Sequence, residues 1–379
     1  MSATLPEGPR SRGWRRIDRA VLVGCFLAIW VPAALLLAGR TARPIENRPL
    51  ATMPTVTVDG LADGTWFKGV DAFVSDNVAV RSIAVRLRGE AYLRTGGTGS
   101  TAVVLGKGGW LFPTNALDPS CTHTAADVGA ALDAAGQLAG AGITFRFVAL
   151  PDKQTIYPEW LGPTVFPPAC TDAQRPALEA ALAAHPELSL DGWKLLGAAP
   201  KGTGERLLYY PHDTHWTGLG AIPVVRSLVQ SIDGRVWSDA DVTEDGTIRH
   251  VGDLGRSIGV TRYDQVVKVQ ARADVVVTRT DIPVPFKLKN EPSIFETATS
   301  TTRPVIEGKT LIVYDSFFGT QWQLLAPYFR DAIWVHIGDL QDHPEVVSML
   351  GPFKTVVVQR VERFLYLDDL GAVVRIVGQ

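Results

Sequence analysis

The sequence predicts an α/β fold in which a mostly parallel sheet is flanked by helices on both faces. From about residue 101, short apolar runs alternate with helical patterns, which is typical of parallel strands joined by crossover helices. Near-continuous apolar runs, such as residues 310–314 and 355–358, indicate strands that are buried on both faces. The chain has 379 residues, 46% of them hydrophobic, which is enough for one large core or two medium ones.

An uncharged stretch at residues 20–39 predicts one N-terminal transmembrane helix before this fold. As a helix it is roughly 30 Å long, enough to cross the hydrocarbon core of a bilayer. Five arginines precede it, so the positive-inside rule places residues 1–19 in the cytoplasm and everything after Arg40 outside. A cleaved signal peptide is the alternative, and a buried helix would leave the arginines unexplained. We favour an uncleaved anchor, because the run is long and ends in a poor cleavage site.

Composition separates a lead-in segment from the main domain. Residues 41–64 are rich in Pro, Thr and Gly and are expected to form an extended stalk. Residues 66–94 have apolar positions at mixed three-and-four spacing, which predicts one or two amphipathic helices, and the TGGTGS run at 95–100 is a flexible break. The expected order is a cytoplasmic arm, an anchor, a stalk with helical lead-in, and the α/β domain, at residues 1–19, 20–39, 40–100 and 101–379.

Each element of the α/β domain has its own sequence signal. Two short strands flank the Lys107–Gly109 turn, an Ala-rich run predicts a helix at 125–142, and a β-branched and aromatic run predicts a strand that ends at Pro151. Further helices are expected at 172–185, 217–232, 317–329 and 344–351, and further strands at 205–211, 309–316, 332–338 and 355–361. Residues 235–305, rich in Asp, Thr and Arg and with short strands such as residues 273–279, are interpreted as an insertion or irregular cap.

Composition and motifs exclude several classes of function. The net charge of −2 argues against a nucleic-acid-binding protein with a broad basic face. The sequence contains no nucleotide-binding glycine motif and no metal-ligand spacing, so we expect no cofactor and no metal. Three cysteines exclude a disulfide-dense scaffold. Cys121 and Cys170 lie beyond the predicted anchor and are candidates for a disulfide, the alternative being two buried thiols.

The first candidate site lies at residues 209–217, where the predicted strand ends and a helix begins. Ligand sites collect at this edge of a parallel sheet. Asp213 and His215 are two positions apart, so the carboxylate can hold the imidazole Nδ1–H and leave Nε2 as a base. The alternative is that Asp213 caps the helix and His215 is a surface residue.

The second candidate site lies at residues 311–319, where an apolar strand leads into Asp315, Ser316 and a helix. A serine hydroxyl there can project from the sheet edge while adjacent backbone N–H groups stabilise an oxyanion. The alternative is that Ser316 only caps the helix. Taken together, the two sites supply a nucleophile, Ser316, a base, His215, and an orienting carboxylate, Asp213, for attack on an acyl carbonyl.

These residues resemble the alginate O-acetyltransferase AlgJ/AlgX family of SGNH-hydrolase-like domains. The resemblance rests on Asp-Thr-His-Trp at 213–216, followed by Thr-Gly-Leu-Gly-Ala, and on Asp-Ser-Phe at 315–317. As in that family, Asp-x-His precedes the nucleophile, although Tyr314 stands where the family has Gly. Supporting pieces across residues 44–365 are Glu46-Asn47-Arg48, Asp76-Asn77 with Arg81, Gly109-Trp110-Leu111-Phe112, Pro151-Asp152-Lys153 with Tyr157-Pro158-Glu159, Gly252-Asp253-Leu254 and Glu362-Arg363.

The resemblance implies an SGNH-hydrolase-like catalytic domain with Ser316 as nucleophile, His215 as base and Asp213 as orienting residue. It implies transfer of an acetyl group to hydroxyls of an extracytoplasmic polysaccharide, such as alginate or another exopolysaccharide, through an acetyl-serine intermediate. The donor is expected to be a multi-span membrane acyltransferase that passes acetyl groups through the membrane. The chain is therefore expected in the cell membrane, with its catalytic domain on the periplasmic or extracellular side.

Three further residues are candidates for lining the acceptor cleft: Lys153, Tyr157 and Trp216. Lys153 and Tyr157 follow a strand end, although Lys153 can equally pair with a core carboxylate. Trp216 can stack on a sugar or simply cover His215. Two other functions use the same residues. One is a carbohydrate O-acetyl esterase, in which water replaces the sugar acceptor. The other is a non-catalytic scaffold of a polysaccharide biosynthesis complex.

Overall fold

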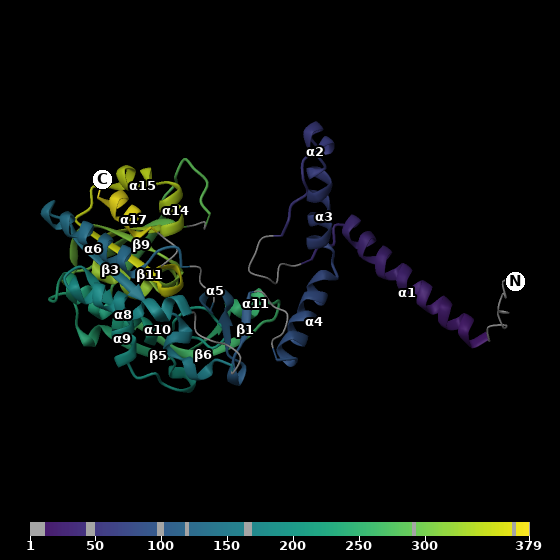
Figure 1. Ribbon diagram of the computed structural model, residues 1–379, viewed down its shortest axis with the longest axis horizontal. Coiled ribbons are helices and arrows are strands. Elements are labelled where there is room, and N and C mark those ends of the chain that lie inside the picture. Colours follow the sequence, from purple (N-terminus) through teal and green to yellow (C-terminus); the bar gives the residue numbers. More distant parts are fainter. Residues whose placement is uncertain are drawn as a thin grey trace. The chain divides into compact units, whose positions relative to one another are not determined.

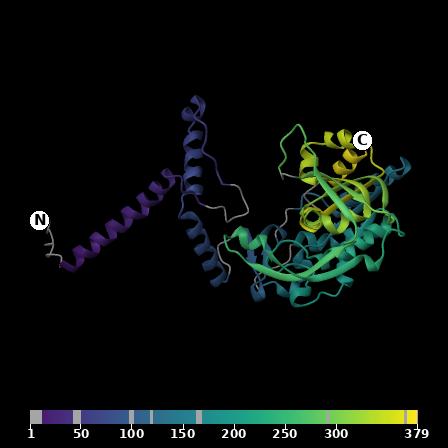
Figure 2. The same ribbon diagram turned by 180° about the vertical axis from the view of Figure 1, so that it is seen from behind.

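The computed structural model describes residues 12–42, 50–96, 102–117, 121–162, 169–289, 293–365 and 369–378 (Figures 1 and 2). The chain divides into two compact units. The first comprises Met1–Thr95 with Arg256–Val260, and the second comprises Gly96–Gly255 with Thr261–Gln379.

Helices make up most of the described part of the first unit. Their bounds are α1 (Arg12–Leu37), α2 (Val58–Ala62), α3 (Thr65–Asn77) and α4 (Arg81–Arg94). The amphipathic pattern at residues 66–94 therefore corresponds to two helices, α3 and α4. Asp76, near the end of α3, accepts a hydrogen bond from the Ala51 N–H (2.9 Å) and pairs with Arg81 (3.4 Å). These contacts join the start of α4 to the segment that precedes α2.

Helix α1 includes most of the segment that the sequence predicts to cross a membrane. Within the part of the chain that the structure describes, no helix combines the length and the hydropathy needed for a membrane span. The structure therefore does not confirm the transmembrane helix at residues 20–39, which stays a prediction.

A seven-stranded mixed sheet forms the centre of the second unit, in the order β4-β3-β11-β9-β10-β8-β7. Its strands are β3 (Thr144–Leu150), β4 (Ser189–Asp191), β7 (Val276–Asp281), β8 (Ile294–Ser300), β9 (Ile306–Tyr314), β10 (Phe329–His336) and β11 (Thr355–Val361). The strands from β4 to β10 are parallel, β8 pairs antiparallel with β10, and β7 pairs antiparallel with β8. The sheet is thus mixed rather than mostly parallel, because residues 276–300, expected as an irregular insertion, add two antiparallel strands.

Helices cover both faces of this sheet. Successive residues of a strand point to opposite faces, so each strand contributes side chains to two cores. In β9, Leu311 and Val313 join a core that includes residues of α6 (Ala125–Gly140), α8 (Ala169–Ala184) and α17 (Leu370–Val377). Ile312 and Tyr314 join the opposite core, which includes residues of α10 (Gly218–Ile232) and α13 (Trp322–Leu325). This double burial explains the near-continuous apolar sequence of β9 and β11.

The remaining strands of the second unit form two small antiparallel pairs. β1 (Val103–Leu105) pairs with β2 (Leu111–Pro113) around the expected turn, and β5 (Val242–Val251) pairs with β6 (Tyr263–Ala271) as a separate ribbon. The other helices are α5 (Thr114–Leu117), α7 (Lys153–Ile156), α9 (Gly192–Ala198), α11 (Asp253–Ser257), α12 (Ser316–Thr320), α14 (Ile337–Asp342), α15 (Glu345–Leu350) and α16 (Glu362–Leu365).

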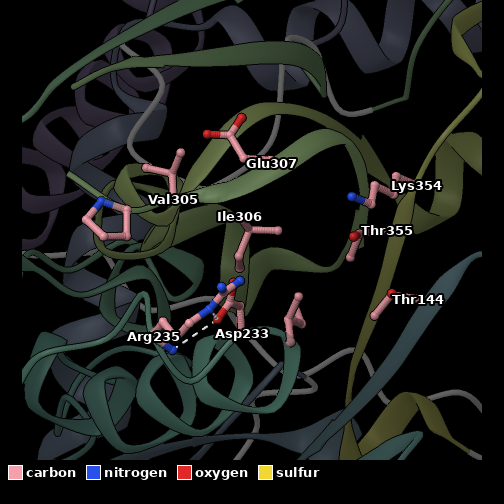
Figure 3. Close-up of a pocket in the computed structure, with 10 residues that line it drawn as sticks. Thr144, Asp233, Arg235, Val305, Ile306, Glu307, Lys354 and Thr355 are labelled. Atoms are coloured by element: carbon pink, nitrogen blue, oxygen red, sulfur yellow. Dashed lines mark hydrogen bonds and ion pairs between the residues drawn. The ribbon is translucent and has the colours of Figure 1, made fainter. Parts of the chain in front are cut away.

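The carboxyl ends of the parallel strands lie along one side of the sheet, here called the carboxyl edge. Their amino ends lie along the opposite side, here called the amino edge. At the carboxyl edge, β3, β9 and β11 lead into Asp152, Asp315 and Glu362, all of which are buried. At the amino edge, the first residues of the same strands line a pocket of about 430 Å³ (Figure 3). The pair of Asp233 and Arg235 lies on the wall of this pocket. Of the candidate site residues, Lys153 and Ser316 follow the carboxyl ends of β3 and β9.

Candidate active site

Ser316 lies just beyond the carboxyl end of β9, in a turn that Asp315 holds in place. Asp315 is the N-cap of α12, and its carboxylate accepts hydrogen bonds from the N–H groups of Phe317 (2.9 Å) and Val361 (2.8 Å). The Asp315 N–H donates to the side-chain carbonyl of Gln359 (3.1 Å). Asp315 therefore takes the capping role that the sequence left open for Ser316, and the half-buried Ser316 is the first residue of the helix.

Asp213 and His215 lie near the tip of a loop that folds back on itself. The Thr217 N–H donates to the carbonyl of Leu208 (2.8 Å), which closes the loop at its base. The strand predicted at 205–211 is wrong. An isolated bridge joins Tyr209 to Trp216, two residues of this same loop, and lies outside the named strands. The apolar and aromatic side chains that suggested a strand are instead buried in the core beneath the loop.

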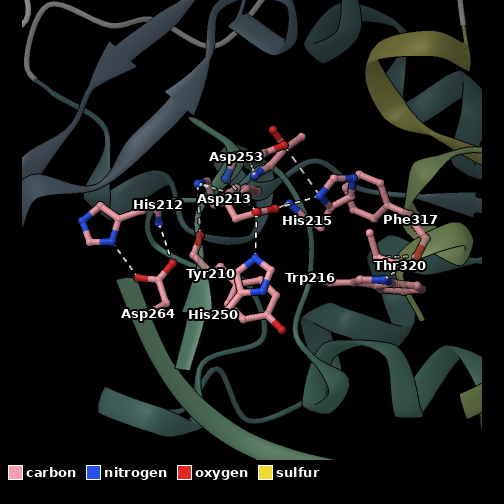
Figure 4. Close-up of polar contacts among 12 residues, drawn as sticks. Tyr210, His212, Asp213, His215, Trp216, His250, Asp253, Asp264, Phe317 and Thr320 are labelled. Atoms are coloured by element: carbon pink, nitrogen blue, oxygen red, sulfur yellow. Dashed lines mark hydrogen bonds and ion pairs between the residues drawn. The ribbon is translucent and has the colours of Figure 1, made fainter. Parts of the chain in front are cut away.

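The Asp213 carboxylate accepts four hydrogen bonds (Figure 4). Its Oδ1 accepts from the Nδ1–H of His215 (2.7 Å) and from the His215 backbone N–H (2.9 Å). Its Oδ2 accepts from Nε2 of His250 (2.8 Å) and from the Asp253 backbone N–H (2.9 Å). The predicted Asp–His contact is therefore present, and a second histidine occupies the other carboxylate oxygen.

These donors keep Asp213 ionised although it is buried. Burial raises the pKa of a carboxyl group, but the hydrogen bonds from His215 and His250 outweigh that effect and hold the pKa of Asp213 well below its usual range. A permanent negative charge at this position favours the Nδ1–H tautomer of His215 and stabilises its imidazolium.

The Nε2 atom of His215 is buried and has no hydrogen-bond partner among the described residues. The His215 ring lies 5.3 Å from the ring of Phe317, the residue after Ser316, and Figure 4 shows the two rings side by side. Trp216 fixes this approach, because its indole N–H donates to the Phe317 carbonyl (3.0 Å). The structure thus brings the Asp213–His215 loop to the Ser316 turn, without a hydrogen bond between His215 and Ser316 in the described part.

Lys153 lies in the interior and not along an open surface, with a relative exposure of 1%. Its ammonium donates to the backbone carbonyls of Asp213 (2.7 Å), Tyr210 (3.1 Å), Pro211 (3.2 Å) and Leu111. Burial lowers the pKa of Lys153 to about 7, although Asp213 opposes that change. Lys153 therefore binds the backbone of the loop that carries the Asp–His pair.

Tyr157 and Trp216, the other two residues expected along a cleft, are also buried. The Tyr157 hydroxyl accepts a hydrogen bond from the Leu208 N–H (2.9 Å) at the base of the same loop. Trp216 is fully enclosed and stacks on Phe318 with ring centroids 6.0 Å apart. In the described structure both side chains hold the loop in place by packing and hydrogen bonding.

A buried charged cluster joins the ends of β3 and β11. Asp152 and Arg363 form a buried ion pair, and the Arg363 N–H also donates to Asp152 (2.9 Å). Glu362 accepts from the Asp152 N–H (3.0 Å) and from the Thr155 hydroxyl (2.6 Å). Burial, reinforced by the charge of Glu362, raises the pKa of Asp152 to about 7, although Arg363 opposes it. The motif pieces at 151–153 and 362–363 thus contact each other.

Sequence reasoning missed His250 and Asp253, which both contact the Asp–His pair. Asp253 accepts from the Thr214 N–H (2.7 Å), and its carboxylate lies 3.8 Å from His215 Nδ1. Gly252 permits this approach, because a Cβ there would lie 2.2 Å from the His212 carbonyl oxygen. The Gly-Asp-Leu triplet was a visible signal but is equally typical of an ordinary turn. His250 had no local signal, because its ribbon was not predicted.

Asp213, His215 and Asp253 each place one possible metal-ligand atom within 4.8 Å of the others. Both oxygens of Asp213 already accept two hydrogen bonds, and His215 Nδ1 donates one of them. Because hydrogen bonds use these lone pairs, we assign the cluster to hydrogen bonding and no metal to it.

Of the two cysteines expected to pair, Cys121 is disulfide-bonded. The side chain of Cys170 lies outside the described residues, so its pairing with Cys121 stays a prediction. Cys25, in α1, is free and exposed.

The fold and the site together define the class of the domain. Parallel strands between helical layers, with an Asp–His pair beside a serine turn at their carboxyl edge, form an SGNH-hydrolase-like α/β domain. One family model, described as the SGNH hydrolase-like domain of the acetyltransferase AlgX, matches residues 103–302, more than half of the chain. The chain belongs to this family, as the sequence resemblance predicted.

Three solved structures illustrate the range of similar folds. The O-acetyltransferase domain of Pseudomonas putida AlgJ is 17% identical, and the match covers 70% of this chain and 93% of that chain with a TM-score of 0.45. Bacillus cereus PatB1 is 13% identical, with 71% and 98% coverage and a TM-score of 0.46. Pseudomonas aeruginosa AlgX is 16% identical, with 72% and 65% coverage and a TM-score of 0.38. A comparison with curated proteins finds no match.

Proposed function

We propose that the protein is a membrane-anchored, extracytoplasmic O-acetyltransferase that moves acetyl groups to hydroxyls of a cell-surface polysaccharide. The observation that carries the proposal is the Asp213–His215 pair. The His215 Nε2 is buried, has no partner among the described residues and lies beside the Ser316 turn. Membership in an acetyltransferase family supports acetyl transfer as the reaction class.

In the first half-reaction, Ser316 Oγ attacks the acetyl carbonyl carbon while His215 Nε2 takes the hydroxyl proton. Asp213 stabilises the resulting imidazolium through Nδ1. The bond between the acetyl carbon and the donor heteroatom then breaks, and His215 delivers its proton to that leaving atom. The Phe317 N–H is already bonded to Asp315, so we propose the Ser316 N–H, which has no intrahelical acceptor, as a donor for the oxyanion.

In the second half-reaction, a sugar hydroxyl attacks the acetyl-serine carbonyl and gives its proton to His215. The Ser316 Oγ–acetyl bond breaks, and His215 returns the proton to Ser316. The net result is an acetyl ester on the glycan and a regenerated enzyme. Replacement of the sugar by water would turn the same steps into ester hydrolysis, so the acceptor decides between a transferase and an esterase.

The first test is intact mass spectrometry of the purified full-length chain after incubation with p-nitrophenyl acetate. The expected result is a mass increase of about 42 Da, the acetyl group in place of a hydrogen, on the wild type and not on Ser316→Ala. Ser348→Ala is the matched control, because Ser348 is an exposed serine whose hydroxyl bonds only to its own helix. An equal adduct on Ser316→Ala, or none on any protein, would contradict the proposed nucleophile.

A second experiment supplies an oligosaccharide acceptor to the acetylated enzyme. Movement of acetate to the sugar, with faster loss of the adduct, supports the transferase. Loss of acetate to water at the same rate with and without sugar would instead make the protein an esterase.

The anchor and the location are part of the proposal and have their own test. The uncharged stretch at 20–39 and the preceding arginines support a single span with residues 1–19 in the cytoplasm. The full chain is expected to stay with membranes after alkaline carbonate washing, and a chain without residues 1–40 is expected to be released. Protease added outside spheroplasts should digest the catalytic domain. Release of the full chain by carbonate would contradict the anchor.

A multi-span membrane acyltransferase is the proposed acetyl donor. Acetylation of the glycan in cells should then require both that partner and Ser316. Acetylated glycan in cells that lack every multi-span acyltransferase would contradict this arrangement.

A further inference from the structure

We propose that His250 is a positioning residue that shares Asp213 with His215, so that its protonation sets the proton affinity of His215. This inference rests on the proposed function, because it concerns the base of the same site. The juxtaposition that carries it is one carboxylate with an imidazole on each oxygen, His215 on Oδ1 and His250 on Oδ2 (Figure 4).

The two imidazoles lock the rotation of the Asp213 carboxylate. His250 Nε2 lies 2.8 Å from Oδ2, and the Asp253 N–H reaches the same oxygen at 2.9 Å. A carboxylate held by donors on one oxygen only can turn about its side-chain bonds. With donors on both oxygens, Oδ1 stays aimed at His215 Nδ1, which keeps the imidazole oriented for proton transfer.

His250 is itself held in place from a different part of the chain. It lies on β5, opposite Asp264 of β6 in the ribbon, and its ring stacks on Tyr210 with centroids 4.1 Å apart and an interplanar angle of 21°. Its side chain is 33% exposed, whereas that of Asp213 is 4% exposed. Solvent can therefore deliver protons to His250, while the carboxylate that receives its hydrogen bond stays dry.

The groups around His250 favour its charged form. Burial lowers its pKa, but the hydrogen bond and the charge of Asp213, together with Asp264 and Asp253, raise the pKa of His250 above its ordinary value. The charged and titratable groups that face this cluster are Asp213, Asp253, Asp264, His212, His215, Lys153 and Tyr210.

The charge on His250 acts on His215 through the shared carboxylate. An imidazolium at position 250 draws on the negative charge of Asp213 and repels a second imidazolium at His215, so it opposes proton transfer to His215. When His250 loses its proton, its Nε2–H still donates to Asp213, but the repulsion disappears and His215 becomes a stronger base. The pH profile of acetyl transfer then contains two linked ionisations.

Two substitutions separate the hydrogen bond from the charge. His250→Gln keeps an N–H donor for Asp213 but carries no charge, and His250→Leu removes both. In full-length protein with labelled histidine rings, the His215 resonance is followed by NMR through a pH titration and assigned with His215→Gln. We expect the pKa of His215 to rise by about 1 in His250→Gln, because a positive neighbour is lost.

Kinetics supply the second readout. His250→Leu is expected to lower kcat by about 10-fold to 100-fold with little change in KM, because Asp213 loses a donor that holds its orientation. His250→Gln is expected to recover most of kcat above pH 8 and to lose one ionisation from the profile. His185→Gln is the matched control, because His185 pairs with Asp133 (3.3 Å) and does not contact the site. This substitution should leave the His215 titration unchanged.

The outcomes separate this inference from the proposed function. A pKa of His215 that is the same in His250→Gln and wild type, or a His250→Leu enzyme with full kcat, would overturn the coupling. Because the NMR titration needs no turnover, a raised pKa in a protein that transfers no acetyl group would support the coupling and refute the acetyltransferase. A drop in thermal stability alone, with an unshifted titration, would show that His250 is merely structural and would overturn the inference.

Discussion

The carboxyl and amino edges of the central sheet carry similar charged residues in opposite environments. At the amino edge, Asp233 pairs with Arg235 (2.7 Å), a side chain that is 88% exposed, beside a pocket of about 430 Å³ (Figure 3). Hydrogen bonds from Arg235 lower the pKa of Asp233 to about 2. At the carboxyl edge, burial raises the pKa of Asp152 to about 7 and lowers that of Lys153 to about 7.

This contrast separates an ion pair that is exposed to water at the amino edge from charged groups that are buried at the carboxyl edge. Water solvates the ion pairs of the amino edge, so their groups keep ordinary protonation states. At the carboxyl edge Asp152 and Lys153 are buried, so their neighbours affect their protonation more strongly. The following substitutions test the contrast, from the largest expected effect to the smallest.

The largest effect is expected for Ser316→Ala. Loss of the nucleophile should lower kcat for acetyl transfer by roughly 10⁴-fold to 10⁶-fold, as measured with a chromogenic ester. The melting temperature should stay within about 2 °C, because Asp315 and not Ser316 caps α12. A Ser316→Ala variant with the kcat of the wild type would show that Ser316 is not the nucleophile.

Asp213→Asn should follow, with a decrease in kcat of about 10⁴-fold. The amide can present its own N–H to His215, which then places its proton on Nε2 and can no longer act as a base. Asp245→Asn, on an exposed carboxylate of the β5–β6 ribbon, is the matched control and should leave kcat unchanged. Equal rates for Asp213→Asn and wild type at saturating substrate would exclude the orienting role.

Lys153→Met should act on stability. Its loss leaves backbone carbonyls around Asp213 without a donor, and the free energy of unfolding should fall by about 3 kcal/mol. Lys194→Met, on the exposed side of α9, is the control and should change it by less than about 0.5 kcal/mol. Chemical denaturation monitored by tryptophan fluorescence measures both.

Lys153 also makes the free energy of unfolding depend on pH, and its pKa fixes the sign of that dependence. Its pKa is about 7 in the folded protein against an ordinary value of 10.5, so the unfolded chain binds more protons between these values. Stability of the wild type should therefore rise with pH from about 7 to about 10, and Lys153→Met should lose that rise. A wild type that loses stability over this interval relative to Lys153→Met would contradict the assignment.

The smallest effects are expected at the amino edge. Arg235→Gln and Glu307→Gln break ion pairs that are exposed to water, Asp233–Arg235 (2.7 Å) and Glu307–Arg330 (2.9 Å). Each should change the free energy of unfolding by less than about 0.5 kcal/mol and leave kcat unchanged. A tenfold loss of acetyl transfer in either variant would show that the amino edge takes part in the function.

The sequence predicted four central strands that are buried on both faces, but not the largely buried β8 or the exposed β5. The runs at β3, β9, β10 and β11 were found within a few residues, because double burial makes them apolar nearly throughout. The β5–β6 ribbon was missed, since β5 is exposed over nearly all of its length and has no apolar alternation. At 205–211 a strand was predicted where the chain forms a loop. The buried apolar side chains of this loop resemble the apolar pattern of a strand.

The candidate site was predictable where its residues are neighbours in the sequence. Asp213 and His215 stand two positions apart, and Asp315 and Ser316 are adjacent, so each pattern was visible locally. The contact between the two pieces, and the return of His250 to Asp213 across 37 residues, depend on how the loop and the ribbon fold. The interior placement of Lys153 could not be read from its sequence, because a lysine after a strand is more often exposed.

The position of β11 has a consequence for a protein that is still being made. β11 lies between β3 and β9, although it is the last strand along the described chain. Its end supplies the Val361 N–H that holds Asp315 and the Arg363 side chain that binds Asp152. A ribosome-bound or prematurely terminated chain therefore carries Asp213, His215 and Ser316 without the strand that sets the Ser316 turn. If the proposed function holds, such nascent and truncated chains should not accept an acetyl group, because the Ser316 turn is not yet held in place.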